Sequence, residues 1–216
     1  MVIKISNFKF QISNSRTVVD AGIPLAEVVE KIAQSSLSGL EFCTGIPGTV
    51  GGAVVGNAGA WQQAIGDRVK MVKVLGKNDK VKWIKKEDCQ FDYRQSRFKQ
   101  SGEIVLAVEL ELAESSETKI REKMAEYLAK RSQQPKELSA GSIFVNPKPE
   151  AAGSLIEKVG LKGYQIGQAQ ISSQHANFII NLGGASCRDV LELISLAKKT
   201  VKEKFGVDLE EEVKII

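Results

Sequence analysis

The stretch Gly45–Ala60, GIPGTVGGAVVGNAGA, has six glycines in sixteen residues and so leaves its backbone open to close approach. Glycine lacks a Cβ and permits positive φ, which lets successive N–H groups converge on an anion. The pattern reads neither GxGxxG nor GxxxxGK, so the common dinucleotide and P-loop fingerprints do not explain it. It predicts either a phosphate-bearing cofactor site or a tight turn of small residues between packed elements.

Three further segments carry side chains suited to polar chemistry. The segment Gln90–Gly102, QFDYRQSRFKQSG, is richer in aromatic and cationic residues than a plain hairpin turn needs. The sequence AGSIF places Ser142 after Ala-Gly, and LEEEV places three glutamates side by side at Glu210–Glu212. Each also has an ordinary structural explanation: Arg94 is a loop arginine, Ser142 a turn residue, and the glutamates an acidic surface strand.

The elements that must position these segments follow from the hydrophobic periodicity. Two strands divided by a turn at Asn7 are predicted within Val2–Ile12, and further strands at Thr17–Ala21, Val69–Gly76, Lys80–Lys85, Glu103–Leu112, Asn177–Asn181 and Val207–Ile216. Helices are predicted from Pro24 to before Leu40, and at Ser116–Arg131, Ala152–Val159 and Arg188–Phe205. A break at Gln133–Pro135 follows the second helix and indicates a boundary. The fold class is α+β.

Composition narrows the function classes. The 216 residues suffice for one large or two small domains, and the net charge of +4 is mild. The basic clusters Lys80–Lys86 and Lys198–Lys204 are mixed with acidic or apolar residues, which favours solvated faces over nucleic-acid binding. Cys43, Cys89 and Cys187 are far apart, which predicts buried reduced thiols and no metal site. The sequence shows no membrane span and no signal peptide, so a cytoplasmic protein that binds no membrane is expected.

Five motifs in order give the chain a family resemblance. They are GIPGTVGGAVVGNAGAW, FDYRQSRFK, QQPKELSAGSIFVNP, AAGSLIEKVGLKGYQIGQAQISSQHANFIIN and FGVDLEEEV. This set resembles the UDP-N-acetylenolpyruvoylglucosamine reductase (MurB) family over nearly the whole chain. The resemblance implies FAD and NADPH as cofactors and a fold of the vanillyl-alcohol oxidase type. It divides the chain into a partial FAD-binding domain at 1–114 and a C-terminal substrate-binding domain at 115–216.

The resemblance also implies a reaction and three catalytic residues. NADPH would reduce FAD, and a hydride would then pass to the vinyl carbon of an enolpyruvyl ether. Arg94 matches the family's arginine, which would stabilise charge developing on the neighbouring carbon and carboxylate. Ser142 of AGSIF matches the proton donor. Glu212, the second glutamate of an LExEV pattern, matches the third catalytic position, with Glu210 and Glu211 as its competitors.

Binding residues follow from the same resemblance. Those matched to FAD are Gly45, Ile46, Pro47, Gly48, Thr49, Gly51, Gly52, Asn57 and Gly59. Those matched to the UDP-sugar substrate are Tyr93, Lys99, Asn146 and Lys214, whose cations suit a diphosphate. His175, the one histidine of the sequence, is interpreted as structural or substrate-lining.

The chain also departs from the family pattern. The family's first FAD subdomain has a short glycine-serine-asparagine loop, which 1–44 does not supply, and Val145 stands where the family often has lysine. These departures leave alternatives: a UDP-sugar or nucleotide-binding module or an inactive remnant that has lost FAD, or one half of a split enzyme completed by a separately encoded N-terminal FAD subdomain. Without that partner a monomer is expected. A covalent-flavin oxidase is disfavoured because no histidine or cysteine stands in or beside the glycine-rich stretch at a suitable attachment point, and Cys43, the closest candidate, is a weak one.

Overall fold

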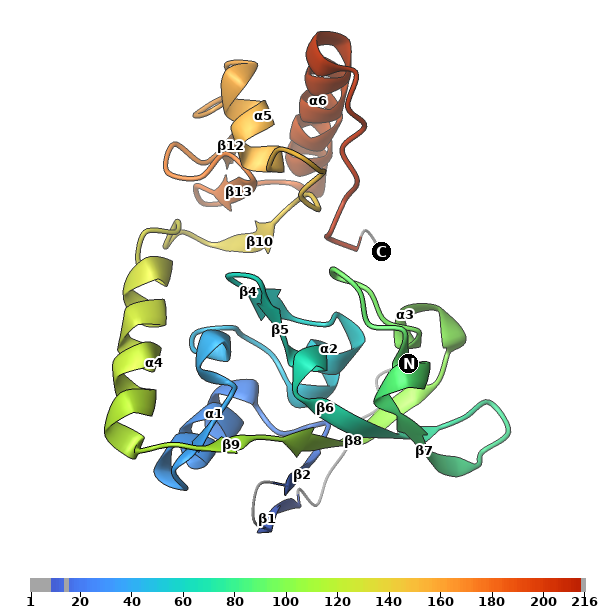
Figure 1. Ribbon diagram of the computed structural model, residues 1–216. Coiled ribbons are helices and arrows are strands. Elements are labelled where there is room, and N and C mark those ends of the chain that lie inside the picture. The colour runs from blue at the N-terminus through green and yellow to red at the C-terminus, as the bar shows by residue number, and fades with distance from the viewer. Residues whose placement is uncertain (1–8, 14–15, 215–216) are drawn as a thin grey trace. The chain divides into compact units, whose positions relative to one another are not determined.

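The computed structural model describes residues 9–13 and 16–214. These residues form two compact units, which divide between Arg131 and Ser132 (Figure 1). The predicted strands Val2–Ile12 and Val207–Ile216 extend in part beyond the described residues.

The first unit is built on a five-stranded antiparallel sheet with the order β1-β2-β8-β6-β7. Its strands are β1 (Phe10–Ser13), β2 (Arg16–Asp20), β6 (Val69–Leu75), β7 (Val81–Lys85) and β8 (Ile104–Glu111). The sequence predicts the last three because apolar and polar residues alternate along them. The ladder between β6 and β8 shifts register twice, between Val69 and Met71 and between Lys73 and Val74.

Shorter elements connect the sheet strands of the first unit. They are β3 (Leu37–Ser38), β9 (Ala113–Glu114), β4 (Gly59–Ala60), β5 (Gln63–Ala64), α3 (Phe98–Ser101) and the 3-10 helices η1 (Glu41–Cys43), η2 (Ile65–Asp67) and η3 (Lys86–Cys89). The strands pair as two small antiparallel ladders, β3 with β9 and β4 with β5.

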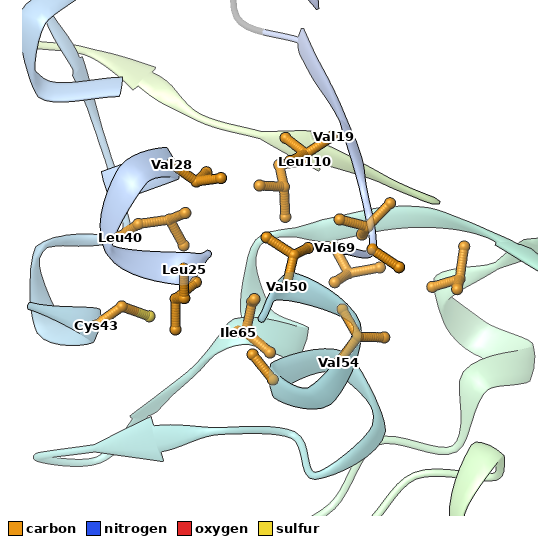
Figure 2. Packing of buried hydrophobic residues seen from close by; sticks show 14 of the residues in the cluster. Val19, Leu25, Val28, Leu40, Cys43, Val50, Val54, Ile65, Val69 and Leu110 are labelled. Atoms are coloured by element: carbon orange, nitrogen blue, oxygen red, sulfur yellow. The ribbon is translucent and has the colours of Figure 1, made fainter. Parts of the chain in front are cut away.

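Two helices fill the core of the first unit. Pro24 is the N-cap of α1 (Leu25–Gln34), whose buried stripe includes Leu25 and Val28. The second helix, α2 (Val50–Val55), was not predicted, because two of its six residues are glycine and glycine has low helix propensity. Figure 2 shows side chains from α1, α2, β2, β6 and β8 gathered in one core. Burial of that apolar face stabilises a helix whose propensity is poor.

Helix α4 (Glu117–Arg131) belongs to the first unit. Ile120 is buried, and Met124 and Tyr127 pack on the first core. The ring of Tyr127 stacks on Trp61 with centroids 4.7 Å apart. The boundary between the two compact units therefore follows α4, close to the predicted break at Gln133–Pro135. The domain division at 114/115 that the resemblance implies would assign this helix to the second unit.

The second unit packs two helices against a four-stranded sheet with the order β10-β13-β12-β11. Its elements are β10 (Ser139–Ser142), α5 (Ala152–Lys158), β11 (Gln165–Ile166), β12 (Ala169–Ile171), β13 (Phe178–Asn181) and α6 (Cys187–Phe205). Helix α6 begins at a capping box between Ser186 and Asp189 and ends at Gly206, which has a φ of 71°.

Two predictions are corrected. The strand predicted at Val207–Ile216 is wrong over its described part, where a single bridge pairs Glu211 with Phe144. The apolar alternation in this tail instead places Leu209 in the second core, where it is buried. Cys43 and Cys89 are buried as predicted, but Cys187 is exposed at the start of α6.

Candidate functional site

The exposed part of the glycine-rich stretch precedes helix α2. Gly45, Pro47, Gly48 and Thr49 are exposed. The backbone N–H groups of Gly48 and Thr49 have no hydrogen-bond partner among the residues that the structure describes. The next two donors are used within the fold, because Val50 N donates to Ile23 O at 3.0 Å and Gly51 N to Ala21 O at 2.8 Å. Two adjacent donors are therefore available to an anion at 48–49.

The glycines of this stretch have two different functions. A Cβ on Gly51 would lie 2.8 Å from Ala21 Cβ, and one on Gly59 would lie 2.3 Å from Gln63 O, so both glycines are required by packing. A Cβ on Gly48 would have no atom within 4 Å, and its φ of +105° suits glycine. A Cβ on Gly52 would meet only Thr49 Oγ1, at 3.6 Å. The open positions at 48 and 52 fit a phosphate-bearing group that approaches the backbone closely.

The predicted arginine loop packs on the end of the same stretch. Asn57 Nδ2 donates to Asp92 O at 2.8 Å, and Ser96 Oγ donates to Val55 O at 2.6 Å. Between them, Arg94 Nη1 donates to Gly59 O at 2.8 Å. Arg94 has a φ of 54° at the tip of a tight turn closed by paired backbone bonds between Asp92 and Gln95. The first unit thus brings the Arg94 guanidinium to the backbone of Gly59.

Arg131 supports the start of the glycine-rich stretch. Its Nε donates to Thr44 O at 2.7 Å, and its guanidinium carbon lies 4.8 Å from the centre of the Trp61 ring. Its Cδ would lie 2.9 Å from a Cβ on Gly45. Burial lowers the pKa of Arg131. Its charge is nonetheless retained at neutral pH, because arginine titrates far above that range.

The second unit brings Ser142 and Glu212 to one short segment. Ile143 follows Ser142 directly, and its carbonyl oxygen accepts from Glu212 N at 2.8 Å. Val145 N donates to Glu210 O at 2.9 Å, so the two chain segments run side by side over three residues. Ser142 and Glu212 are both half-buried. Two of the three predicted catalytic residues are therefore neighbours in this unit.

The geometry separates Glu212 from its two competitors. Glu211 forms an ion pair with Lys198 at 2.8 Å, and the hydrogen bond from that ammonium lowers the pKa of the Glu211 carboxyl. Glu210 is exposed, and its backbone carbonyl takes the bond from Val145. A carboxylate held by a lysine is a poor choice for a role that needs an elevated pKa. Glu212 remains the best candidate of the three.

The predicted substrate residues divide between the units. Tyr93 is exposed beside Arg94, and Lys99 is exposed on α3. In the second unit, Lys214 is exposed, and Asn146 Oδ1 accepts from Ala152 N at 3.1 Å, which caps the start of α5. Asn146 therefore has a structural function that the sequence did not indicate.

His175 has structural contacts. Its Nδ1 accepts from Asn177 N at 3.3 Å, and its ring meets Phe178 edge to face at 4.9 Å. Burial lowers the pKa of His175, so its imidazole is neutral at pH 7.

Sequence reasoning missed three side chains of these sites: Ser96, Arg131 and Asn177. Ser96 and Asn177 are both buried and bond to backbone distant in the sequence, Ser96 to Val55 and Asn177 to Phe144. No local pattern marks such a bond, because it depends on which segments the fold brings together. Over the described ranges 9–13 and 16–214, no three or more His, Cys, Asp or Glu side chains cluster as a metal site, and no helix is long and apolar enough to cross a membrane.

Comparison with known proteins identifies the family. The C-terminal domain of UDP-N-acetylenolpyruvoylglucosamine reductase matches residues 133–216, and an FAD binding domain matches residues 1–85. The UDP-N-acetylenolpyruvoylglucosamine reductase of Thermotoga petrophila is 43% identical over 96% of this chain and 74% of its own length. Reductase 1 of Bacillus anthracis is 44% identical over 95% of this chain and 69% of its own.

A solved structure gives the same result. The crystal structure of UDP-N-acetylenolpyruvylglucosamine reductase (MurB) from Thermus caldophilus matches with a TM-score of 0.82 and 40% identity, covering 94% of this chain and 74% of that one. Sequence and structure comparisons therefore agree with the resemblance found in the motifs and with the α+β fold class. The chain belongs to the UDP-N-acetylenolpyruvoylglucosamine reductase family.

Proposed function

We propose that this chain is an NADPH- and FAD-dependent reductase that converts UDP-N-acetylenolpyruvoylglucosamine to UDP-N-acetylmuramate. The observation that carries the proposal is the exposed glycine-rich loop with available N–H donors at 48–49, within the residues that match an FAD binding domain. The relatives named for this reductase activity share 43% and 44% of their aligned residues with the chain. We place the reaction in cytoplasmic peptidoglycan precursor synthesis, which serves the cell wall, cell shape and division, and we expect a monomer.

The first unit would hold the flavin. Gly48 and Thr49 supply N–H donors to its pyrophosphate, and the uncovered backbone at Gly52 allows close approach. Bound FAD supplies a carrier that takes a hydride from NADPH and passes it to the substrate. Arg131 keeps the loop in place through its bond to Thr44 O, and Asn57 does so by accepting from Gly66 N at 2.9 Å.

Arg94 would stabilise negative charge on the substrate. Addition of a hydride to the terminal vinyl carbon builds charge on the neighbouring carbon and its carboxylate. A guanidinium held in place beforehand lowers that barrier without having to reorganise. The bond from Arg94 to Gly59 O provides such a fixed position.

Ser142 and Glu212 would handle the proton in the second unit. The hydroxyl of Ser142 gives its proton to the carbon that carries the developing charge, which completes reduction of the double bond. Glu212 hydrogen-bonds the substrate carboxyl, for which a protonated side chain beside that anion is suited. Because both residues are connected to Ile143, this segment sets their spacing.

The test is spectroscopic and enzymatic. The purified chain is titrated with FAD while the visible flavin absorbance is recorded, and NADPH and UDP-N-acetylenolpyruvoylglucosamine are then added in turn. The proposal predicts bound flavin that NADPH bleaches and the enolpyruvyl substrate re-oxidises, with UDP-N-acetylmuramate as product. Binding of the UDP-sugar without any flavin would instead support a binding module. Bound flavin that the substrate leaves reduced would also overturn the proposal.

A further inference from the structure

The side chain of Asn177 binds the backbone that follows the catalytic serine. Its Oδ1 accepts from Phe144 N at 2.9 Å, and its Nδ2 donates to Phe144 O at 2.8 Å. The backbone oxygen of Asn177 also accepts from Ile143 N at 2.8 Å. Asn177 is 2% exposed, so water does not compete for these bonds. Three bonds from one buried residue hold two consecutive residues.

This contact begins where regular strand pairing ends. The ladder between β10 and β13 pairs Ser139 with Ile180 and Ser142 with Phe178, so one extra residue lies between the two pairs on β10. Gly141, within this irregularity, has a φ of +82°. Side chains alternate between the faces of a strand, so a slip of one residue would turn Ser142 to the opposite face. The bonds from Asn177 fix the register immediately after the irregularity.

The opposite edge of the same segment holds the catalytic glutamate. Ile143 O accepts from Glu212 N at 2.8 Å, while Val145 N donates to Glu210 O at 2.9 Å. Ile143 and Phe144 therefore lie between Asn177 on one side and the glutamate segment on the other. A shift of this segment would displace Ser142 and Glu212 together.

We infer that Asn177 is a positioning residue for the proton-transfer step. Its carboxamide holds Ile143–Phe144 in the one register that sets Ser142 and Glu212 at working distance from the substrate. It acts through these two residues and needs no contact with the substrate itself. This inference rests on the proposed roles of Ser142 and Glu212.

The first test separates the two half-reactions in Asn177→Asp. The aspartate is nearly isosteric, but its second oxygen faces Phe144 O, where an N–H donor is needed. In this variant, NADPH is expected to reduce the bound flavin at the wild-type rate. Re-oxidation by the enolpyruvyl substrate is expected to be about 100-fold slower, because a small displacement of Ser142 slows proton transfer by about this factor. Asn181→Asp, the same change at an asparagine on β13 that caps the following turn, is the control with wild-type rates. Equal rates of re-oxidation in both variants would overturn the inference.

A double-mutant cycle tests whether Asn177 acts through the serine. If it does, Asn177→Asp slows re-oxidation far less in a Ser142→Ala background than in the wild type, because the group it positions has been removed. Full additivity of the two effects would contradict the inference. An effect of Asn177→Asp on folding alone would change the yield of flavin-loaded protein and leave both rates per flavin untouched.

Amide hydrogen exchange on the wild-type chain tests the Asn177 contact directly. The measurement requires no enzymatic activity and no variant protein. The amides of Ile143, Phe144 and Glu212 are expected to exchange slowly and at similar rates. Each of them donates a hydrogen bond either to Asn177 or to the Ile143–Phe144 segment that Asn177 holds. Fast exchange at Phe144 would overturn the inference whatever the activity. Absence of reductase activity with slow, joint exchange would instead overturn the proposed function and leave the positioning contact established.

Discussion

Three side chains near the candidate sites donate hydrogen bonds to backbone carbonyl groups that are distant in the sequence. Arg94 donates to Gly59 O, Ser96 to Val55 O, and Asn177 to Phe144 O. Each bond joins segments at least 33 residues apart in the sequence. A side chain that hydrogen-bonds to a distant carbonyl group fixes both partners, so Ser96 and Asn177 hold backbone close to the candidate residues Arg94 and Ser142.

Ser142→Ala is the most direct test of proton transfer. Flavin reduction by NADPH should stay within a factor of about two, since it does not use the hydroxyl, whereas re-oxidation by the enolpyruvyl substrate should slow by about 100- to 10,000-fold. Stopped-flow absorbance of the flavin measures both. Ser195→Ala, at an exposed position on α6 of the same unit, is the matched control and should behave as wild type. If both half-reactions slow equally in Ser142→Ala, the serine is not the proton donor.

Glu103 links stability of the first unit to pH. Its side chain is 7% exposed and contacts Arg97 at 3.0 Å and Lys82 at 3.1 Å. Burial raises the pKa of this carboxyl, but hydrogen bonds from Lys82 and Ser101 and the charge of Arg97 outweigh burial, so the pKa is lowered overall. A carboxyl with a lowered folded-state pKa adds stability above its unfolded pKa, and that stability is lost as the pH falls through the folded value.

Glu103→Gln should therefore lower the free energy of unfolding at pH 7 by about 1 to 3 kcal/mol. The difference from wild type should shrink as the pH drops below about 4, because protonation removes the charge from the wild-type carboxyl too. Urea unfolding at several pH values measures this. Glu126→Gln, which removes an exposed partner of Lys130 on α4, should leave stability unchanged. A difference that stays constant from pH 7 to pH 3 would show that the charge of Glu103 is not responsible.

At the scale of elements, helix α2 contains two adjacent glycines in different surroundings. Gly51 packs against Ala21, whereas Gly52 has room for a side chain. A Cβ at 51 would meet Ala21 Cβ at 2.8 Å, whereas one at 52 would meet nothing closer than 3.6 Å. Gly51→Ala should destabilise the chain by about 1 to 3 kcal/mol through overpacking. Gly52→Ala should raise or preserve stability, since alanine is the better helix former.

The two glycine variants also differ in flavin affinity. If the proposed flavin site is right, Gly52→Ala should weaken FAD binding without lowering the melting temperature, because a methyl group then covers backbone that this site needs open. Fluorescence titration with FAD and thermal melting of apoprotein give the two quantities separately. If Gly52→Ala binds FAD as tightly as wild type, the open face of α2 is not part of the flavin site.

The sequence predicts elements well where their periodicity is strong. The meander β6-β7-β8 and the helices α1, α4 and α6 follow from alternation or from an apolar stripe. Helix α2 does not follow from periodicity. It forms because the Thr49 N-cap and the burial of Val50 and Val54 outweigh the low helix propensity of its two glycines. For the sites, motifs identify Arg94, Ser142 and Glu212 as candidates, but the bonds from Asn177 depend on pairing between segments that no local pattern reveals.

At the scale of the whole molecule, two separate cores are joined by an exposed connection. Residues 136–140 are exposed, and Lys136 offers a trypsin site after α4. Limited trypsin digestion should cut first after Lys136 and leave two resistant fragments, because each unit has its own buried cluster. Mass spectrometry of the early products identifies the cut. First cleavage at Lys123 or Lys130 within α4 would show that the helix is less firmly packed on the first unit than described.

The differing environments of the three cysteines give the protein a built-in labelling position. Burial raises the pKa of Cys43 to about 12 and that of Cys89 to about 11, so both stay as unreactive thiols near neutral pH, while Cys187 is exposed. A maleimide dye should therefore attach to the second unit of the unmodified sequence at one position. Energy transfer between that dye and the tryptophans of the first unit, Trp61 and Trp83, would then test whether binding of cofactor or substrate changes their separation.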